Sequence, residues 1–234
     1  MMDRLSQIRQ AEAASHRDAY ASHELFAPGS WLAKPVKTVL ELLPLFGGYD
    51  AFQALDLGCG VGRNCIPVAR FFRGVPCRIQ CVDILDQAIE KLNENARRYD
   101  VAQAIQGVVS SIDEYEIQAD RFDLIMAISA LEHTDSEAAF IRKLEQIRDG
   151  LRRGGIACLI VNANVRELDK ATARELMPQF EVNLQTGELQ NILGRVFTDW
   201  GPIKHTVAHQ KYEIPREKGA ALLETDVVTF VARK

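Results

Sequence analysis

The stretch Ala54-Leu55-Asp56-Leu57-Gly58-Cys59-Gly60-Val61-Gly62-Arg63-Asn64 decides the fold of this chain. An apolar run ends at Leu57, which predicts a buried strand, and apolar side chains recur at helical spacing after Asn64. The three glycines between these segments permit backbone torsions and a close ligand approach that a Cβ would forbid. The free N–H groups of the following helix suit an anionic group. The stretch therefore predicts a strand–turn–helix unit that binds a ligand at the carboxyl end of the first strand.

Short apolar runs alternate with helical patterns from Gln53 to Val161, which is typical of βαβ units around a parallel sheet. The expected strands are Phe52–Leu57, Ile79–Asp83, Ala104–Val109, Phe122–Ile128 and Ile156–Asn162. Helices are expected at Asn64–Phe72 and Asp86–Arg98, around Phe140 to Leu151 with Thr134 and Glu137 spaced as a capping box, and around Leu189 to Phe197. The runs His205–Ile214 and Thr225–Ala232, separated by the turn Pro215–Gly219, predict an antiparallel hairpin. The fold class is thus α/β.

The length of 234 residues, with 47% hydrophobic residues, suits one domain with a short addition. We expect residues 48–234 to form this domain. Residues 1–47 are partly helical with a break at Pro28-Gly29, and we expect them to form a lid or brace over the sheet.

Charge and composition exclude several classes of protein. The chain has 28 basic and 32 acidic residues without a basic stripe, which disfavours a nucleic-acid partner. No apolar run approaches the ~18 residues that span a bilayer, so we expect a cytoplasmic protein without a membrane partner, as a monomer or a homodimer. The five cysteines are expected to be reduced. Cys77, Cys81 and His133 lack the spacing of a metal site, and no metal is expected.

Asp83 ends the second predicted strand, 21 residues after Gly62, where a carboxylate can accept hydrogen bonds from both hydroxyls of a ribose. The alternative is that Asp83 caps the helix that begins near Asp86. A nicotinamide dinucleotide is the competing ligand, but its fingerprint G-x-G-x-x-G differs from the G-x-G-x-G found here. Asp56 would also repel a phosphate, whereas it can engage an ammonium group.

Four motifs together resemble the motif series of class I S-adenosylmethionine-dependent methyltransferases: Asp56 to Asn64, Val82-Asp83, Phe122-Asp123-Leu124-Ile125 and Arg153-Gly154-Gly155. The resemblance covers about residues 35–165. Looser motifs are similar to the tellurite-resistance (TehB-type) methyltransferases, namely Gly62-Arg63-Asn64, Ser129-x-Leu-Glu-His133, Gly187-Glu-Leu189, Phe197-x-x-Trp200 and Phe230 to Lys234. The resemblance implies a Rossmann-like seven-stranded sheet, mostly parallel, with an antiparallel C-terminal hairpin strand and helices on both faces.

The resemblance also implies S-adenosylmethionine as the cofactor and a set of residues that bind it. Gly58 and Gly60 would approach the methionine moiety, Asp83 the ribose, Ser111 and Ile112 the adenine, and Ser129 the sulfonium. The full set of expected cofactor-binding residues is Asp56, Gly58, Cys59, Gly60, Asn64, Asp83, Ile84, Ser111, Ile112 and Ser129. Many family members carry Asp where Ser111 stands, so Asp113 or the backbone is the alternative adenine contact.

The candidate catalytic residues are His133, His209 and Arg216. His133 follows the fourth strand together with Glu132, where a neutral imidazole can accept a proton, or it packs under the next helix. The family's His-Arg pair before the last strand has no clean equivalent, and His209, Tyr212 and Arg216 lie nearest to its position. On the hairpin, His205, His209 and Lys211 form either a basic wall or an exposed edge strand. Trp31 either closes over the cofactor or, as we favour, belongs to the core.

These observations predict methyl transfer to a small acceptor, with a chalcogen oxyanion, thiol or selenol as the leading class. The motif of amino-group DNA methyltransferases is missing after the fourth strand, where Ser129 to His133 stand instead. A small carboxylate or hydroxyl metabolite is the alternative acceptor. A cofactor-binding module without activity and a nicotinamide oxidoreductase are the other functions considered.

Overall fold

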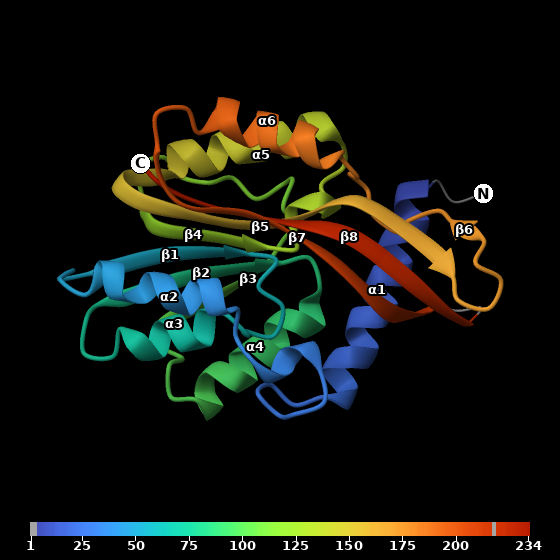
Figure 1. The fold of residues 1–234 in the computed structure, drawn as a ribbon. Coiled ribbons are helices and arrows are strands. Elements are labelled where there is room, and N and C mark those ends of the chain that lie inside the picture. Colours follow the sequence, from blue (N-terminus) through green and yellow to red (C-terminus); the bar gives the residue numbers. More distant parts are fainter. Residues whose placement is uncertain (1–3, 217–218) are drawn as a thin grey trace.

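A computed structural model describes residues 4–216 and 219–234 of the chain. Its centre is one sheet in the order β3-β2-β1-β4-β5-β8-β7, with the two-residue strand β6 paired to β5 (Figure 1). The strands are β1 (Phe52–Leu57), β2 (Cys77–Asp83), β3 (Ile105–Val109), β4 (Phe122–Ile128), β5 (Leu151–Asp169), β6 (Glu175–Leu176), β7 (Gly201–Arg216) and β8 (Gly219–Arg233). Apart from β6, this is the predicted sheet of seven strands.

Helices cover both faces of the sheet, as predicted (Figure 1). They are α1 (Arg4–Ser22), α2 (Lys37–Leu42), α3 (Cys65–Phe71), α4 (Asp86–Arg98), α5 (Glu137–Gly150) and α6 (Thr186–Val196), with the 3₁₀ turns η1 (Trp31–Ala33), η2 (Leu43–Phe46) and η3 (Leu131–His133). Strand β4 is buried along its whole length, and its side chains alternate between two cores. Leu124 and Met126 pack on the side of α2, α3 and α4, while Ile125 and Ala127 pack on the side of α5 and α6.

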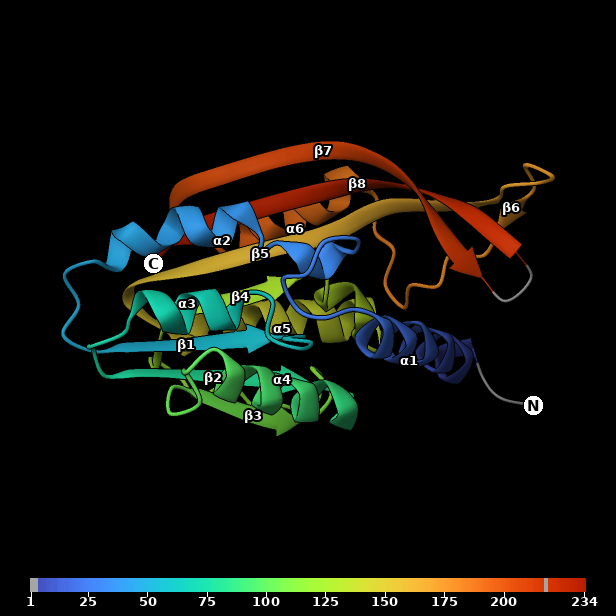
Figure 2. The same cartoon turned by 90° about the horizontal axis from the view of Figure 1, so that it is seen from below.

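The parallel strands β1 to β4 end at one edge of the sheet, and this edge positions the candidate site. Strand β1 pairs in parallel with β2 and β4, so Leu57 lies beside Val82 and Ala127. In two perpendicular views, α1 lies beyond these carboxyl ends (Figures 1 and 2). The glycine turn after β1 therefore opens toward α1.

The predicted hairpin is confirmed, but its strands and β5 are much longer than expected. Strand β8 runs antiparallel to both β5 and β7, and the pairing reaches Asp169 with Ala221 and Arg216 with Gly219. Because an antiparallel ladder does not have to stop where the parallel strands end, it extends past the sheet edge as an arm beside α1 (Figure 2). A register shift between Ala163 and Arg166 marks the start of this arm. Of the predicted turn, Glu217 and Lys218 lie outside the described residues.

The predicted capping box is wrong in its details. The N-cap of α5 is Ser136, whose side chain accepts a hydrogen bond from the N–H of Ala139 at 3.2 Å. The hydroxyl of Thr134 instead donates to the carbonyl of Leu131. Among the helices that the structure describes, none has the length and apolar character needed to cross a membrane.

Candidate active site

The glycine turn is held tightly between its neighbours. The N–H groups of Gly58 and Cys59 both donate to the carbonyl of Val82 at the end of β2, at 2.8 and 3.0 Å. Gly60 has φ +53°, and a Cβ there would lie 2.9 Å from the hydroxyl oxygen of Tyr20 on α1. A Cβ at Gly62 would instead meet Ile66 and Leu92 at 2.7 and 2.8 Å. Gly60 therefore faces the space under α1, whereas Gly62 allows close packing of α3 and α4.

Asp83 links the end of β2 to the glycine turn. One carboxylate oxygen accepts the N–H of Gly60 at 2.8 Å, and the other accepts the N–H of Leu85 at 3.0 Å, just before α4. Burial raises the pKa of Asp83, while the two backbone hydrogen bonds oppose that rise. Asp83 thus connects the glycine turn to Leu85, the residue before α4, whose own side chain provides no cap.

Asp56 is a buried carboxylate with an unused acceptor. It lies near the end of β1 and is 1% exposed, and its Oδ2 atom has no hydrogen-bond partner among the residues described. Burial raises the pKa of Asp56 to about 7, although the charge of Arg63 opposes this shift. A buried acceptor without a donor costs free energy, so this oxygen is suited to a ligand that brings an N–H group.

The other expected cofactor residues lie around the same edge and differ in exposure and in hydrogen bonding. Ile84 is 53% exposed after β2, and Ser129 is exposed after β4 with φ +50°. Ser111 bonds Glu114 through its hydroxyl, and Ile112 packs against the α5 side of the core. Ile84 and Ser129 are therefore open to a ligand, whereas the hydroxyl of Ser111 has a partner within its own turn.

Two members of the set serve the fold in ways the sequence did not indicate. The thiol of Cys59 is buried in the core, where burial raises its pKa to about 12. Only the backbone of Cys59 is thus expected to contact a ligand. Asn64 is 7% exposed and accepts the N–H of Val36 at 3.0 Å, so it ties the segment before α2 to the glycine turn.

His133 lies at the edge of the site in a tight pair with Glu181. Its Nδ1 atom is 2.8 Å from Glu181 Oε2, and its ring stacks on Phe180 with centroids 5.5 Å apart. Burial alone would lower the pKa of His133, but the hydrogen bond that its ring donates to Glu181 and the charges of Glu132, Glu12 and Glu181 raise it to about 9. The ring is therefore an imidazolium near neutral pH, and it becomes able to accept a proton only in alkaline solution.

The structure does not bring the other two candidate catalytic residues together. His209 and Arg216 are seven positions apart on β7, roughly 23 Å at ~3.3 Å per residue. His209 is 65% exposed and its Nδ1 lies 3.1 Å from Asp226. Arg216 is 16% exposed and forms two hydrogen bonds to the Glu167 carboxylate, at 2.6 and 2.9 Å. Each of these side chains is thus bound to a carboxylate.

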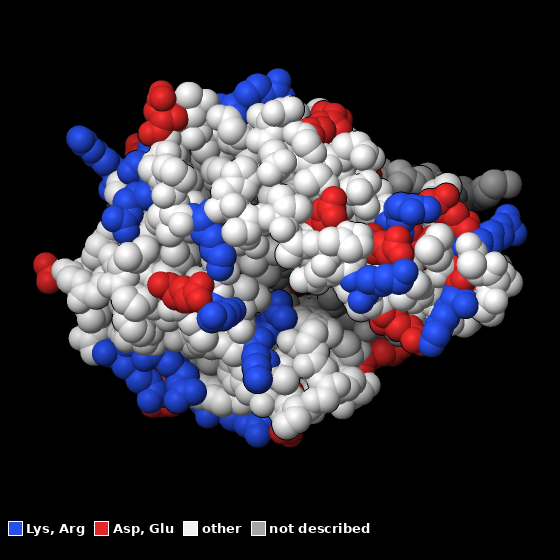
Figure 3. All heavy atoms as spheres, in the orientation of Figure 1, with Lys and Arg blue, Asp and Glu red and all other residues white. Residues whose placement is uncertain are grey.

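The rest of the expected basic wall has the features of an exposed edge strand. Lys211 forms an ion pair with Glu224, and the ring of His205 meets the edge of Phe230 at 5.5 Å. Lys204 pairs with Glu41 at 3.3 Å. On the face drawn in Figure 3, Lys and Arg are likewise interspersed with Asp and Glu. Cross-strand pairing of this kind keeps the outer strand polar and leaves little free positive charge.

Helix α1 brings residues to the site that sequence reasoning missed. Tyr20 is 6% exposed over Gly60, Arg9 pairs with Asp135 and lies 3.5 Å from Glu181, and Glu12 lies 4.0 Å from Arg216. These contacts could not be predicted from the sequence, because α1 lacks a strong apolar face. Trp31, which we expected in the core, is 46% exposed, with the guanidinium of Arg63 5.0 Å from its ring centroid.

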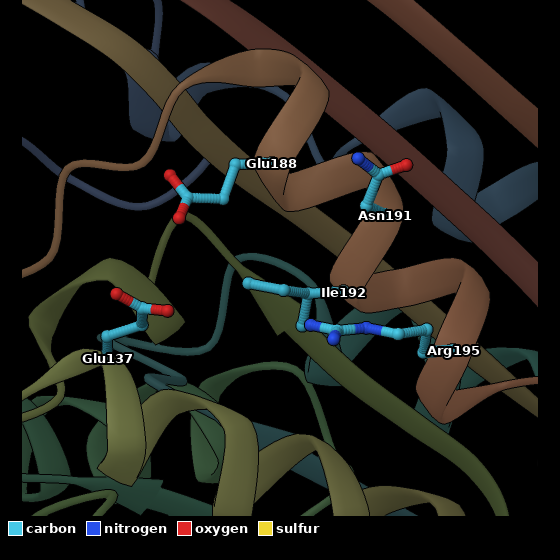
Figure 4. Close-up of a pocket in the computed structure, with 5 residues that line it drawn as sticks. All are labelled: Glu137, Glu188, Asn191, Ile192 and Arg195. Atoms are coloured by element: carbon cyan, nitrogen blue, oxygen red, sulfur yellow. The ribbon is translucent and has the colours of Figure 1, made fainter.

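Two cavities lie near these elements. One, of about 400 Å³, runs between α1 and α4 and includes Tyr20 and Val61 of the glycine turn. The other, of about 590 Å³, lies between α5 and α6 and is lined by Glu137, Glu188, Asn191, Ile192 and Arg195 (Figure 4). The second contains none of the expected site residues, so we place the candidate site at the glycine turn. Within the described ranges, no group of three or more His, Cys, Asp or Glu side chains is arranged to hold a metal ion.

Comparison with known proteins agrees with this geometry. Residues 54–155 match the family described as a methyltransferase domain. The ubiquinone biosynthesis O-methyltransferase of Methylocella silvestris is 24% identical over 181 residues, which are 77% of this chain and 60% of that enzyme. This chain thus spans less than two thirds of the length of that relative.

Solved structures share the fold. TehB from Haemophilus influenzae superimposes with a TM-score of 0.58 at 19% identity, covering 83% of this chain and 61% of that one. The 1,6-didemethyltoxoflavin-N1-methyltransferase of Burkholderia thailandensis, solved with S-adenosylhomocysteine, superimposes with a TM-score of 0.56 at 20% identity, covering 99% and 86%. The motif series, the strand order and the match over residues 54–155 agree, and this part of the chain is similar to the methyltransferase domain of S-adenosylmethionine-dependent enzymes.

Proposed function

We propose that this protein transfers the methyl group of S-adenosylmethionine to a small acceptor. The observation that carries the proposal is the unpartnered Oδ2 of Asp56, buried beside a turn whose Gly60 faces the site without a side chain. An ammonium group such as that of the cofactor's methionine moiety supplies the donor that this oxygen lacks. A phosphate-bearing nicotinamide dinucleotide supplies no such donor and would meet a carboxylate instead.

The remaining expected residues fit the other parts of the cofactor. Asp83 lies at the end of β2, where its carboxylate can exchange the N–H of Gly60 for ribose hydroxyls. Ile84 offers an exposed apolar surface to one side of the adenine, and Ile112 with the backbone near Ser111 offers the other. Asp113 carries an unpartnered, buried oxygen among the described residues and is the alternative contact for the adenine amino group.

The bound cofactor supplies a methyl group on an activated sulfonium, so the chain contributes mainly alignment and the exclusion of water. We propose that residues 1–47 form the lid that excludes this water. Tyr20 of α1 covers Gly60, and Arg9 and Glu12 tie the helix to groups on the acceptor side. Tyr20 has to shift when the cofactor enters, because its hydroxyl occupies the space beside Gly60.

The acceptor suggested by the TehB-type resemblance is a chalcogen oxyanion or a thiol. A site for an oxyanion needs free positive charge, and Arg216, Lys211 and His209 are each paired with a carboxylate. Among these classes, the pairing leaves a neutral thiol better supported than tellurite or selenite. The methyltransferases of Methylocella and Burkholderia named above act on an oxygen and a nitrogen by their names, which makes a small organic acceptor the second candidate.

Calorimetry with S-adenosylhomocysteine and NADH tests the proposal first, and we expect binding of S-adenosylhomocysteine alone. Incubation with methyl-labelled cofactor and a panel of selenite, thiols and small amines, followed by mass spectrometry, then tests for transfer. Tight binding of NADH instead would contradict the cofactor assignment. Binding of S-adenosylhomocysteine with an intact methyl donor after incubation with every acceptor would favour a binding module without activity.

A further inference from the structure

The acceptor side of the site is unusually acidic for a pocket that would take an oxyanion. Carboxylates from five separate parts of the chain meet around His133 and α1. The acidic members of this cluster are Glu12, Asp113, Glu132, Asp135, Glu167 and Glu181, and the basic ones are Arg9, His16, His133 and Arg216. Each arginine is shared between two or more carboxylates, so the basic groups carry no free positive charge.

Glu132 is a member of the cluster that has an unused hydrogen-bond acceptor among the residues described. The side chain is 1% exposed, and its Oε1 accepts both the backbone and the side-chain N–H of Asn162, at 3.1 and 2.6 Å. Its Oε2 is buried and has no hydrogen-bond partner among the residues described. Glu132 belongs to η3 and bonds Asn162 on β5, and its charge acts on both His133 and Tyr212 of the hairpin arm. A buried acceptor in this position lacks one donor.

Aromatic rings border the same space. Phe180 is 8% exposed and stacks on His133, while Tyr212 on β7 is 42% exposed. Aromatic faces together with carboxylates are the surroundings that bind ammonium groups, since both attract a cation and neither attracts an anion. The rings also give an organic acceptor an apolar surface that an inorganic oxyanion cannot use.

We propose that the methyl acceptor is a small amine, whose nitrogen binds as a hydrogen donor at the unpartnered oxygen of Glu132 between His133 and Tyr212. This inference rests on the proposed methyl transfer and deepens it by naming the substrate class. The carboxylates offset the repulsion between an ammonium and the sulfonium, which otherwise opposes the binding of a cationic acceptor.

In the proposed transfer, Glu132 accepts the proton that the amine loses. The amine binds as R–NH₃⁺ and gives one proton to the Glu132 carboxylate, which frees the nitrogen lone pair. This pair forms the N–C bond while the C–S bond breaks, and the electrons of the broken bond stay on sulfur as a neutral thioether. The product leaves as R–NH₂⁺–CH₃, and the protonated Glu132 returns its proton to water.

The experiment uses benzylamine and benzoate, which share a ring and carry opposite charges at pH 7.5. Binding of each to the wild-type chain, loaded with S-adenosylhomocysteine, is followed by ligand-observed NMR. We expect benzylammonium to bind and benzoate not to bind. Glu132→Gln keeps the side-chain shape, and we expect it to weaken benzylammonium at least 10-fold. Glu181→Gln is a second variant that removes charge without altering Glu132, and we expect a smaller loss. Glu90→Gln, exposed on α4, is the matched control that should change nothing.

Three results would overturn the amine assignment. They are preferential binding of benzoate or selenite, no benzylammonium binding by the loaded wild type at millimolar concentration, and unchanged affinity in both glutamine variants. Thermal unfolding identifies a variant that fails to fold, in which case the other variant decides. Calorimetry of S-adenosylhomocysteine distinguishes failure of the proposed function from failure of the amine assignment. If S-adenosylhomocysteine does not bind, the proposed methyl transfer is contradicted. If it binds normally but benzoate binds in place of benzylammonium, only the amine assignment is contradicted.

Discussion

The carboxylate of Asp83 accepts a hydrogen bond from the backbone N–H of Gly60 at 2.8 Å, across 23 residues of sequence. This bond connects the end of β2 to the turn that follows β1, and it fixes the carboxylate at the place where the ligand is expected. Its other oxygen accepts the N–H of Leu85. A substitution of Asp83 therefore acts on the ligand and on the turn together, and the two effects have to be measured apart.

We expect Asp83→Ala to weaken S-adenosylhomocysteine binding by about 1.5–3 kcal/mol, the range for hydrogen bonds to a charged group. Asp83→Asn keeps one carbonyl oxygen and should lose less. Isothermal titration calorimetry measures both, and Asp50→Asn, exposed at the opposite end of β1, is the control. An unchanged dissociation constant in Asp83→Ala, with an unchanged melting temperature, would remove Asp83 from the cofactor site.

Gly60 and Gly74 allow a matched test of the cofactor cradle. Both have positive φ, +53° and +90°, but a Cβ at Gly74 would meet nothing within 4 Å. Alanine at either position should cost about 1–2 kcal/mol of stability through backbone strain. We expect only Gly60→Ala to lose cofactor affinity as well, because its Cβ points toward the ligand.

Tyr20→Phe separates the two consequences of Gly60→Ala, since it removes the hydroxyl that the new Cβ would meet. The double variant should regain part of the melting temperature but not the affinity for S-adenosylhomocysteine. Full recovery of affinity would mean that the glycine serves only the packing of α1. Circular dichroism confirms that each variant is folded.

Much of the fold could be predicted because local patterns and the global fold agree. The alternation of apolar strands and amphipathic helices places β1, β2 and β4 within a residue or two of their observed bounds. The length of β5 could not be predicted, since its continuation past Asn162 depends on pairing with β8, more than 50 residues away. The N-cap of α5 was misplaced because Thr134 and Ser136 are both good cap residues and tertiary geometry chose between them.

The candidate site, like the fold, could be predicted only in part from the sequence. Gly60 and Asp83 were identifiable because they lie at fixed offsets from one strand end, and they do meet in the structure. The partners Glu181 and Tyr20 were not, because they reach the site from a loop and from a helix whose docking no periodicity encodes. His205, His209 and Lys211 were grouped by strand alternation, which gives the face of a side chain but not its partner.

Asp56→Asn should stabilise the ligand-free protein and weaken cofactor binding. The pKa of Asp56 is raised by burial from 3.8 to about 7, so the folded state loses stability as the pH rises from about 4 to about 7. Asn removes this charge, and we expect a higher melting temperature at pH 8, where wild type carries the buried carboxylate. The same change should raise the dissociation constant of S-adenosylhomocysteine at least 10-fold. A lower melting temperature together with unchanged affinity would contradict the assigned role.

The pair of His133 and Glu181 should make the stability fall in alkaline solution. The pKa of His133 is raised from 6.5 to about 9 in the folded state, despite the opposing effect of burial. A raised pKa stabilises fully below about pH 6.5, and this contribution is lost as the pH rises to about 9. It amounts to roughly 3 kcal/mol at most. Urea unfolding at pH 6, 7.5 and 9 should show this loss in wild type.

The loss should be smaller in Glu181→Gln and absent in His133→Gln, which has no group to titrate in this range. Glu12, Glu132, Arg9 and Arg216 also face this region, so Glu12→Gln is a further comparison. A wild-type stability that is flat between pH 6 and 9 would show that the imidazole is not held as a cation.

Variants of Arg216 and His209 compare the stability contribution of a buried ion pair with that of an exposed one. Arg216→Ala leaves the carboxylate of Glu167, which is 1% exposed, buried without its cation, and removal of one partner of a buried pair typically costs about 3–5 kcal/mol. His209→Ala breaks an exposed contact with Asp226 that is worth about 0–1 kcal/mol. Urea unfolding should therefore rank the two variants clearly. The double variant Arg216→Met with Glu167→Gln should recover most of the stability, because it leaves no unpaired buried charge.

The same double variant tests whether Arg216 also contacts an anionic acceptor. If it does, the double variant will have a higher KM for selenite than wild type, while its cofactor affinity is unchanged. Equal KM values in wild type and the double variant would assign Arg216 to the hairpin arm alone.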